Sequence, residues 1–376
     1  MSRSIVLQSE KSIFHRLSGL DWPLVLLIVM VASIGFTALY SAAGGNFSPW
    51  AGKQMARFAV AFVGMILIAL VDVRWWYKSA WWFYGIGFVL LIYVEIMGHI
   101  GMGAQRWINL GFMQLQPSEL MKISLVVVLA RYFHAATPED TKSLTMLVIP
   151  ALLIGAPVGL VMLQPDLGTS LMTAMVGGAL IFVAGAPLWI FIGGAAAIAA
   201  IIPIGWHFMH DYQKGRVLTF LNPERDPLGA GYHITQSKIA LGSGGLKGKG
   251  FLQGTQSHLN FLPEKQTDFI FTLWAEEWGF VGGLALLLLF GLIIAYGLMI
   301  ALRARNNFCR FLTFGIIFNF SIYVFVNVAM VMGLIPVVGA PLPMVSYGGT
   351  AMLAAMIGFG LIMSCSLHRD SKVNRI

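Results

Sequence analysis

Four short polar segments border or interrupt long apolar runs in this sequence, and each contains an acidic residue. An ionisable side chain beside hydrocarbon is costly to bury, so such residues are candidates for a functional role. The chemistry open to them is general base catalysis by a carboxylate and neutralisation of an anionic group by a cation. The segments are Gln116–Lys122, Gln164–Thr169, Leu262–Phe271 and the pair Glu276 and Glu277.

The first segment has the sequence QPSELMK and favours the start of a helix. Pro117 suits the first turn, and Ser118 is a favoured capping residue. Glu119 and Lys122 are three residues apart, so they share one helix face. Two interpretations stay open: a structural ion pair that makes burial tolerable, or a site where Lys122 neutralises a phosphate that Glu119 orients.

The second segment, QPDLGT, falls in a tight turn between two apolar runs. Asp166 could cap the following helix through backbone N–H groups two or three residues on. An acidic residue at the mouth of a cavity could also bind a sugar hydroxyl or a metal ion. The pattern alone leaves both interpretations open.

The third segment ends in Asp268, which an apolar helix follows at once. Burial raises the pKa of a carboxyl group and a nearby cation lowers it, and a carboxylate with such a balance can act as a general base. The alternative is a helix N-cap, for which Asp is also suited. For Glu276 and Glu277 we expect a structural role, with one facing protein and the other solvent.

A glycine-rich stretch, Gly242–Gly250, resembles a phosphate-binding loop. It does not match that spacing, because Ser243 stands where the first glycine should be and Gly250 replaces the Ser or Thr. A flexible glycine turn is the preferred interpretation. No His/Cys cluster at metal-ligand spacing is present, so the sequence leaves the metal unknown.

The composition places these segments in a membrane. Hydrophobic residues make up 58% of the 376 residues and charged residues only 11%, whereas soluble domains are near one quarter charged. Tryptophan pairs such as Trp75/Trp76 border apolar runs, as expected at a bilayer interface. The net charge of +8 comes from basic residues that flank these runs, so we expect a membrane and no nucleic acid as partner.

The apolar runs predict an all-α polytopic membrane protein with ten transmembrane helices. The run that starts at Asp268 is too long for one span, so a short interfacial or re-entrant helix should end near Trp278 and the span should begin near Gly279. The ten predicted spans are 22–42, 58–73, 79–98, 118–135, 143–163, 168–186, 187–208, 279–302, 311–334 and 345–366.

Lys and Arg in the short loops predict the orientation. With a cytoplasmic N-terminus, the inside segments carry thirteen Lys or Arg and the short outside loops carry three. Both termini should then be cytoplasmic, with a large, ordered periplasmic loop between spans seven and eight. The predicted division is a cytoplasmic segment 1–21, a membrane domain 22–366 that includes the outer loop 209–278, and a cytoplasmic tail 367–376.

At these segments the chain resembles the SEDS family (shape, elongation, division and sporulation), and within it the RodA-like elongation branch. The resemblance covers roughly residues 20–368. The motifs that carry it are Gly103–Asn109, Gln116–Lys122, Gln164–Thr169, Gly231–Lys238, Gly248–Gly254, Leu262–Phe271, Gly333–Gly339 and Pro341–Gly349.

The resemblance implies a peptidoglycan glycosyltransferase that joins units of lipid II, the undecaprenyl-pyrophosphate-linked disaccharide pentapeptide, into glycan strands. It makes Asp268 the catalytic residue. A divalent cation (Mg²⁺ or Mn²⁺) is a chemically reasonable helper for the pyrophosphate. One departure is Gln266, because the family usually has His there, which makes a proton relay at that position doubtful. The implied substrate-binding residues are Lys122 as first candidate, and Glu119, Asp166, Arg106, Arg216, Gln116 and Gln164.

The resemblance also implies partners and a location. The partners are a class B penicillin-binding protein, which crosslinks the strands, and other proteins of the elongation machinery. The location is the bacterial inner membrane, with the active site facing the periplasm. Two other functions stay open: a flippase or transporter for the same lipid-linked precursor, and a non-catalytic scaffold. A general base at the end of a large outer loop favours the enzyme, because a transporter does not need one.

Overall fold

The computed structural model describes residues 13–101, 104–109, 111, 114–137, 139–208, 211–222, 230–258 and 264–369. The described helices are α1 (Ile13–Ser18), α2 (Trp22–Ala42), α3 (Ala51–Leu70), α4 (Val73–Met97), α5 (Pro117–Ala135), α6 (Leu144–Leu163), α7 (Leu167–Val183), α8 (Leu188–Phe208), α9 (Asp211–Leu221), α10 (Ala230–Ser243), α11 (Thr255–His258), α12 (Ile270–Arg303), α13 (Asn307–Val331) and α14 (Gly349–Leu367), with a 3-10 turn, η1 (Asp140–Lys142). Three short strands, β1 (His99–Gly101), β2 (Ala104–Asn109) and β3 (Gln114–Leu115), form an antiparallel sheet in that order.

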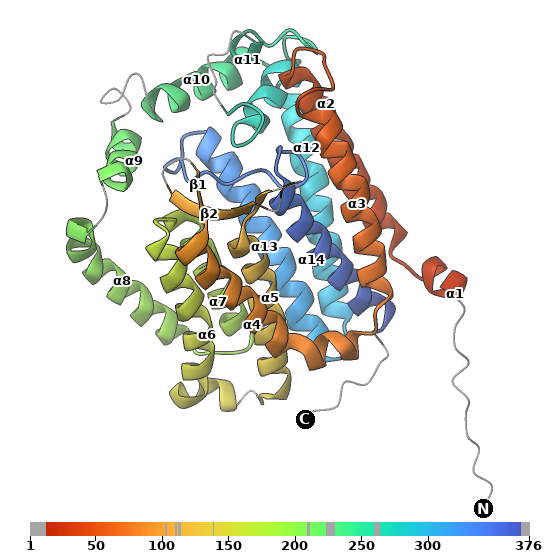
Figure 1. The fold of residues 1–376 in the computed structure, drawn as a ribbon, viewed down its shortest axis with the longest axis vertical. Helices are drawn as coiled ribbons and strands as arrows, with labels where there is room; N and C mark the ends of the chain where they lie inside the picture. The colour runs from red at the N-terminus through yellow and green to blue at the C-terminus, as the bar shows by residue number, and fades with distance from the viewer. Residues whose placement is uncertain are drawn as a thin grey trace, which may run out of the picture.

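Two helices form the centre of the bundle. α5 packs against α4, α7 and α13, and α13 also packs against α12 and α14 (Figure 1). Of the 19 residues of α5, 15 are buried, and a helix buried all round belongs to a core. Glu119 and Lys122 therefore belong to a helix that is enclosed on nearly all sides.

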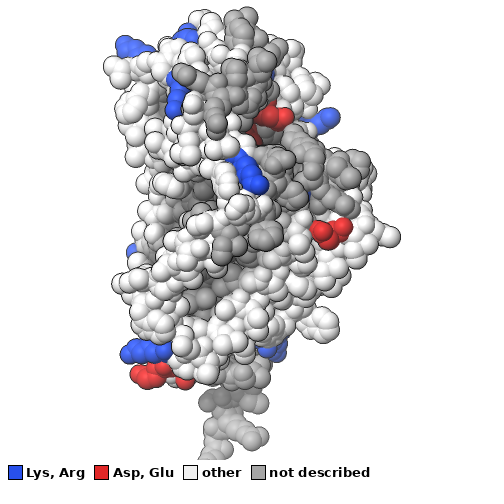
Figure 2. Space-filling model, turned by 90° about the vertical axis from the view of Figure 1, so that its left-hand side faces the viewer, with Lys and Arg blue, Asp and Glu red and all other residues white. Residues whose placement is uncertain are grey.

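The outer surface of the bundle is apolar. Large side chains such as Val60, Ile96 and Phe325 are at least 70% exposed, and in Figure 2 most charged side chains of the visible face lie toward its two ends. Seven of the described helices are long and apolar enough to cross a membrane. α5 is not among them because Glu119, Lys122 and Arg131 lie within it. The chain is thus a predominantly helical, multi-pass membrane protein.

Each of the ten predicted spans falls largely within a helix. The predicted start of the second span, residue 58, was wrong. α3 begins at Ala51 rather than near residue 58. The polar residues of its first two turns have partners elsewhere in the bundle: the Gln54 amide donates to Ser346 O at 2.9 Å. The Arg57 guanidinium lies 4.9 Å from the centre of the Tyr347 ring. Apolar runs in the sequence do not indicate contacts between residues that are far apart in the chain.

The beginning and the end of the bundle lie at the same side. The Tyr296 hydroxyl, near the end of α12, donates to Asp21 Oδ1, just before α2, at 3.0 Å. A small pocket there is lined by Asp21, Arg303 and Arg369, so the end of α14 lies beside the start of α2 and the end of α12. Asp21, before α2, and Arg369, after α14, thus lie at the same end of the bundle.

α12 is broken at Gly279, as predicted, where φ is 66° and ψ is −164°. The glycine-rich stretch closes this break. Lys249 N and Gly250 N donate to Glu276 O and Glu277 O at 3.1 and 3.0 Å, while Phe280 N donates to Gly245 O at 2.8 Å. The stretch thus satisfies backbone groups on both sides of the break. The predicted turn is confirmed, but its backbone bonds to α12 hold it in place, so nothing here supports the expected flexibility.

α10 joins the long segment between α8 and α12 to the bundle. The Ser237 hydroxyl is buried, lies 2.8 Å from Thr272 Oγ1 on α12 and donates to Val331 O on α13 at 2.8 Å. In Figure 1, α10 and α11 lie across the end of the bundle at which α12 begins. The described parts of this segment are therefore helices joined by turns.

Candidate functional site

Asp268 lies in the turn of residues 264–269, immediately before the first half of α12. The N-cap position is Phe269 and the helix begins at Ile270, so Asp268 is not the capping residue. Its side chain is half-buried, and its main-chain carbonyl accepts a hydrogen bond from the Asn327 amide at 2.9 Å. The structure thus removes the alternative that Asp268 serves as an N-cap.

The loop between α13 and α14, residues 332–348, forms a wall beside this turn. The Ser346 hydroxyl donates to Thr267 O at 2.6 Å, and Tyr347 N donates to Gln266 O at 2.8 Å. A Cβ at Gly339, whose φ is +73°, would lie 3.5 Å from Asp268 Oδ2. Because residue 339 has no side chain, only its backbone borders the carboxylate on that side.

The turn before Asp268 is held by Glu264. Glu264 Oε2 accepts hydrogen bonds from the Thr267 hydroxyl at 2.9 Å and from the Gln266 amide at 3.4 Å. The Gln266 side chain therefore has a structural contact within the turn. Burial lowers the pKa of the neighbouring Lys265 ammonium, since an apolar environment disfavours the charged form.

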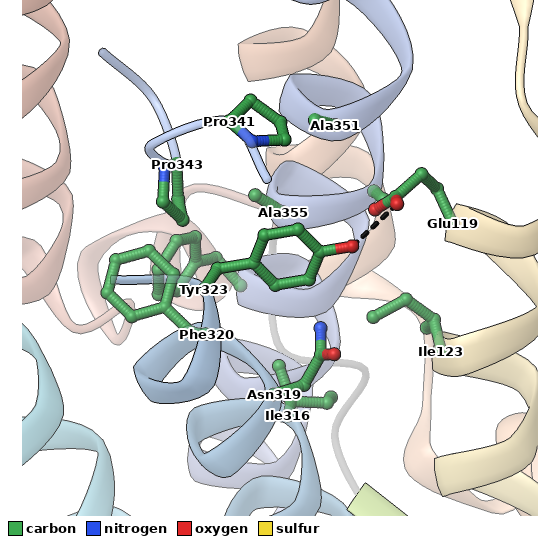
Figure 3. A pocket seen from close by; sticks show the side chains of 12 residues that line it. Glu119, Ile123, Ile316, Asn319, Phe320, Tyr323, Pro341, Pro343, Ala351 and Ala355 are labelled. Carbon is green, nitrogen blue, oxygen red and sulfur yellow. Dashed lines mark hydrogen bonds between the residues drawn. The ribbon is translucent and has the colours of Figure 1, made fainter. Parts of the chain in front are cut away.

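Glu119 and Lys122 form a buried ion pair. Lys122 Nζ lies 2.8 Å from Glu119 Oε1 and 4.3 Å from the centre of the Tyr323 ring, and the Tyr323 hydroxyl donates to Glu119 Oε1 at 2.5 Å. Figure 3 shows the Tyr323 hydroxyl directed at the Glu119 carboxylate. The Lys122 side chain is 0% exposed. The geometry therefore favours the structural interpretation of this pair over direct contact of Lys122 with a phosphate.

A small cavity adjoins the pair, with about 30 Å³ of free space, enough for a water molecule or two. Glu119 and Tyr323 line it, together with Pro341 and Pro343 of the 332–348 loop. Asn319 points into the same space from below (Figure 3). The loop that borders Asp268 thus also covers the ion pair.

Two predicted features of the Gln116–Lys122 segment have different outcomes. Pro117 is the first residue of α5, as predicted, but the expected cap by Ser118 was wrong. The N-cap position is Gln116, and its side chain makes no capping bond. Gln116 N instead donates to Thr350 Oγ1 at 3.2 Å, because the end of β3 brings this backbone against α14.

Arg106 and Asp166 meet at the turn between α6 and α7. Arg106 comes from β2, and its Nη1 lies 3.3 Å from Asp166 Oδ2. The same guanidinium donates to Gln164 O at 3.1 Å and to Pro165 O at 2.6 Å. Asp166 Oδ1 accepts a hydrogen bond from Thr169 N at 3.1 Å, so the predicted capping of α7 is confirmed. Gln164 supports the turn, since its amide donates to Leu91 O at 3.2 Å.

An apolar groove of about 370 Å³ extends from this pair. Arg106 and Asp166 are the charged residues among its lining, and Val338, next to Gly339, forms part of its wall. The groove and the Asp268 carboxylate therefore share the 332–348 loop. The apolar lining comes from Leu167, Leu171, Met172, Met175, Val217, Val326, Ile335, Val337 and Val338.

Three further residues of the prediction have other outcomes. Arg216 lies on α9, and its side chain is outside the described residues. Glu276 and Glu277 are 0% and 1% exposed, so the expectation that one of them faces solvent was wrong. Glu276 Oε1 accepts hydrogen bonds from Lys249 Nζ and Gln256 N, both at 2.9 Å, and Glu277 accepts one from the Ser41 hydroxyl.

Tyr323, Asn327 and Gly339 were not among the residues predicted from the sequence. Asn327 was visible as a polar residue within an apolar run, which is a usable signal. Gly339 lies in a quoted motif, but nothing in the sequence placed it beside Asp268. Within the described residues, no group of three or more His, Cys, Asp or Glu side chains could hold a metal ion.

Known proteins are similar to this chain over more than 90% of its length. The chain is 46% identical to peptidoglycan glycosyltransferase MrdB of Escherichia coli (strain K12), over 92% of this chain and 93% of that protein. It is 36% identical to stage V sporulation protein E of Bacillus subtilis (strain 168), over 93% of this chain and 97% of that protein.

Solved structures match over a similar length. One, described as "Structural coordination of polymerization and crosslinking by a peptidoglycan synthase complex", has a TM-score of 0.80 at 33% identity and covers 93% of this chain and 98% of that one. The rod shape determining protein RodA of Thermus thermophilus has a TM-score of 0.69 at 30% identity, covering 93% and 97%. A family model described as "Cell cycle protein" (FtsW/RodA/SpoVE) matches residues 19–371. The chain therefore belongs to the FtsW/RodA/SpoVE family of membrane proteins.

Proposed function

We propose that this protein is a peptidoglycan glycosyltransferase that polymerises lipid II into glycan strands during cell-wall elongation and the maintenance of rod shape. One observation carries the proposal. The half-buried Asp268 carboxylate lies beside Gly339, which has no side chain, and the same loop borders an apolar groove with a guanidinium at its end. A base, an anion contact and a place for a lipid chain thus adjoin one loop.

In the proposed reaction Asp268 is the general base. The 4-hydroxyl oxygen of the acceptor sugar forms a bond to the anomeric carbon of the donor, and the bond from that carbon to the lipid pyrophosphate breaks. The pyrophosphate leaves with the electron pair, and the hydroxyl proton passes to the Asp268 carboxylate. The Gln266 side chain makes its contact with Glu264, so Asp268 takes the proton without a relay through that position.

Arg106 is our first candidate for contact with the pyrophosphate. Its side chain is 24% exposed, whereas that of Lys122 is 0% exposed. A guanidinium suits phosphate oxygens because its N–H groups form a planar fork. The polyprenyl chain would lie in the apolar groove that begins at the Arg106–Asp166 pair. Lys122 and Glu119 would support the site from within α5.

A divalent cation would help the departure of a pyrophosphate by neutralising its charge. The described residues do not supply a carboxylate cluster for it. Asp166 is paired with Arg106, and Glu119 with Lys122. We therefore route no step through a metal ion and assign no metal ligand.

The proposal includes the surroundings of the site. Ten spans, cytoplasmic termini and an active site facing the periplasm of the inner membrane fit the excess of Lys and Arg in one set of short loops. A class B penicillin-binding protein is the proposed partner that crosslinks the strands, together with other proteins of the elongation machinery. The likeness to a peptidoglycan synthase complex supports this partner.

The test is polymerisation of purified lipid II by the chain together with its cognate penicillin-binding protein. The penicillin-binding protein is used as a variant without its transpeptidase nucleophile, so that the strands stay uncrosslinked. Wild type should produce long glycan strands, and a folded Asp268→Asn variant should produce none. Equal polymer from both would reject Asp268 as the base. If neither makes polymer while reconstituted vesicles translocate lipid II, the protein is a flippase rather than a polymerase.

A further inference from the structure

We infer that Asn327 and Ser346 are positioning residues for the Asp268 carboxylate, a role that rests on the proposed function of Asp268. Together they fix the main chain on both sides of the bond between Thr267 and Asp268. Neither side chain is a candidate for direct contact with the sugars in this inference. They act by holding the base and the 332–348 loop in one fixed arrangement.

The Asn327 amide joins Asp268 to the loop that faces it. Asn327 lies on α13, is 0% exposed, and its Nδ2 donates to Asp268 O at 2.9 Å and to Ala340 O at 2.7 Å. Ala340 follows Gly339, the residue beside the Asp268 carboxylate. One rigid side chain in the bundle thus sets the spacing between the base and its neighbouring wall.

The orientation of this amide is fixed by its surroundings. If the amide were rotated by 180°, its oxygen would face the carbonyl oxygens of Asp268 and Ala340, and neither can donate a hydrogen. In the observed orientation Asn327 Oδ1 is buried and accepts no hydrogen bond from the described part of the chain. A buried polar atom without a partner is unfavourable. The two donated bonds are therefore the reason for a polar residue at this position.

Ser346 holds the other side of the same backbone. Its hydroxyl donates to Thr267 O at 2.6 Å and accepts from Leu342 N at 2.7 Å. The Gln54 amide donates to Ser346 O at 2.9 Å and so fixes the main chain of Ser346 against α3. Consecutive carbonyls, of Thr267 and Asp268, are thus held from the 332–348 loop and from α13.

The experiment measures kcat and KM for lipid II with the full chain and its cognate penicillin-binding protein. Asn327→Leu keeps the size of the side chain and removes both donors, and Ser346→Ala removes the hydroxyl. Each should lower kcat by about ten- to a hundredfold, with KM changed less than about twofold. Ser321→Ala is the matched control, because within the described residues the Ser321 hydroxyl on α13 donates to Ile317 O of its own helix and to no other group.

A graded series separates positioning from a purely structural role. In Asn327→Asp the new carboxyl is buried and faces two carbonyl oxygens, so it takes up a proton and donates one hydrogen bond where Asn327 donates two. kcat per folded molecule should then lie between the values of wild type and Asn327→Leu. A structural residue would lower the thermal midpoint but leave kcat per folded molecule unchanged in both variants, which would overturn the inference.

The outcomes also separate this inference from the proposed function. Wild-type kcat in Asn327→Leu and Ser346→Ala, with no polymer from Asp268→Asn, would reject the positioning role alone. Full activity in Asp268→Asn would reject the assignment of the base and this inference with it. Should Asn327→Leu fail to fold, Ser346→Ala decides, because its hydroxyl can be removed with a smaller loss of volume.

Discussion

Gly339 lies against the carboxylate of Asp268: a Cβ at position 339 would be 3.5 Å from Asp268 Oδ2. The backbone of Gly339 has a φ of +73°, a conformation that costs an L-residue about 1–2 kcal/mol. Glycine therefore serves two purposes here. It allows the loop to turn, and it leaves space beside the proposed base.

We predict that Gly339→Val abolishes polymerisation while the protein still folds. The branched side chain would occupy the space beside Asp268 in which the acceptor hydroxyl must approach. Gly45→Val is the matched control, because Gly45 also has a positive φ, +83°, and its nearest neighbours belong to Leu252 and Tyr40. If the two variants have similar thermal midpoints and similar polymerisation activity, the acceptor hydroxyl does not approach through the space beside Asp268.

The apolar groove gives a second prediction, on substrate affinity. Met175→Trp should fill part of the groove and raise KM for lipid II with little change in kcat. Excluding two methylene groups of a lipid chain costs about 1.6 kcal/mol, or roughly fifteenfold in affinity. Val183→Trp is the control, since Val183 is an exposed residue of the same helix that does not line the groove. Equal KM values in the two variants would place the lipid chain elsewhere.

Features that depend on neighbouring residues were predictable from the sequence. The break of α12 at Gly279 followed from an apolar run too long for one span. The capping of α7 by Asp166 was one of two interpretations that the sequence left open, and it followed from the preference of Asp for the N-cap position. The start of α5 at Pro117 followed from the fixed φ of proline. The cap of α7 and the start of α5 depend on interactions within a few residues, and the break of α12 on the length of one apolar run.

Features that depend on distant contacts were not predictable from one sequence. The exposure of Lys122 is decided by Tyr323, about two hundred positions away. The burial of both Glu276 and Glu277 is decided by Lys249 and Ser41, which approach from other elements. Likewise, no spacing rule places Gly339 next to Asp268. Apolar periodicity gave the helices, but the partners of buried charges come only from the packed fold.

The glycine-rich stretch gives a third prediction, on folding. A Cβ at Gly248 would lie 2.0 Å from Glu277 O, and the φ of Gly248 is +81°. Gly248→Ala should therefore open the contact that closes the break of α12, at a cost of about 2–5 kcal/mol from overpacking and backbone strain. The measurement is the thermal midpoint of the purified protein in detergent.

Gly245→Ala separates the two contributions. Gly245 has a φ of +54° in the same stretch, but nothing lies within 4 Å of a Cβ there. It should show only the strain of the left-handed backbone, about 1–2 kcal/mol. A fall in thermal midpoint that is no larger for Gly248→Ala than for Gly245→Ala would mean that the close approach to Glu277 has little influence on folding.

The buried pair Glu119 and Lys122 provides the fourth prediction, which separates the two interpretations of that pair. Lys122→Met leaves a buried carboxylate with only the Tyr323 hydroxyl as a described partner, and such a loss costs about 3–5 kcal/mol. We expect a strong fall in the thermal midpoint and little polymer. The double variant Glu119→Gln with Lys122→Met contains no unpaired charge, so its thermal midpoint should return close to that of wild type.

Activity of the double variant decides the role of Lys122. If the pair is structural, as the complete burial of Lys122 favours, polymerisation should return together with folding. If the ammonium instead neutralises the pyrophosphate, the double variant should fold and yet make no polymer, because charge removal cannot replace a cation that the reaction requires. Arg106→Gln is the comparison. Loss of its guanidinium should strongly lower polymerisation activity and change the thermal midpoint little.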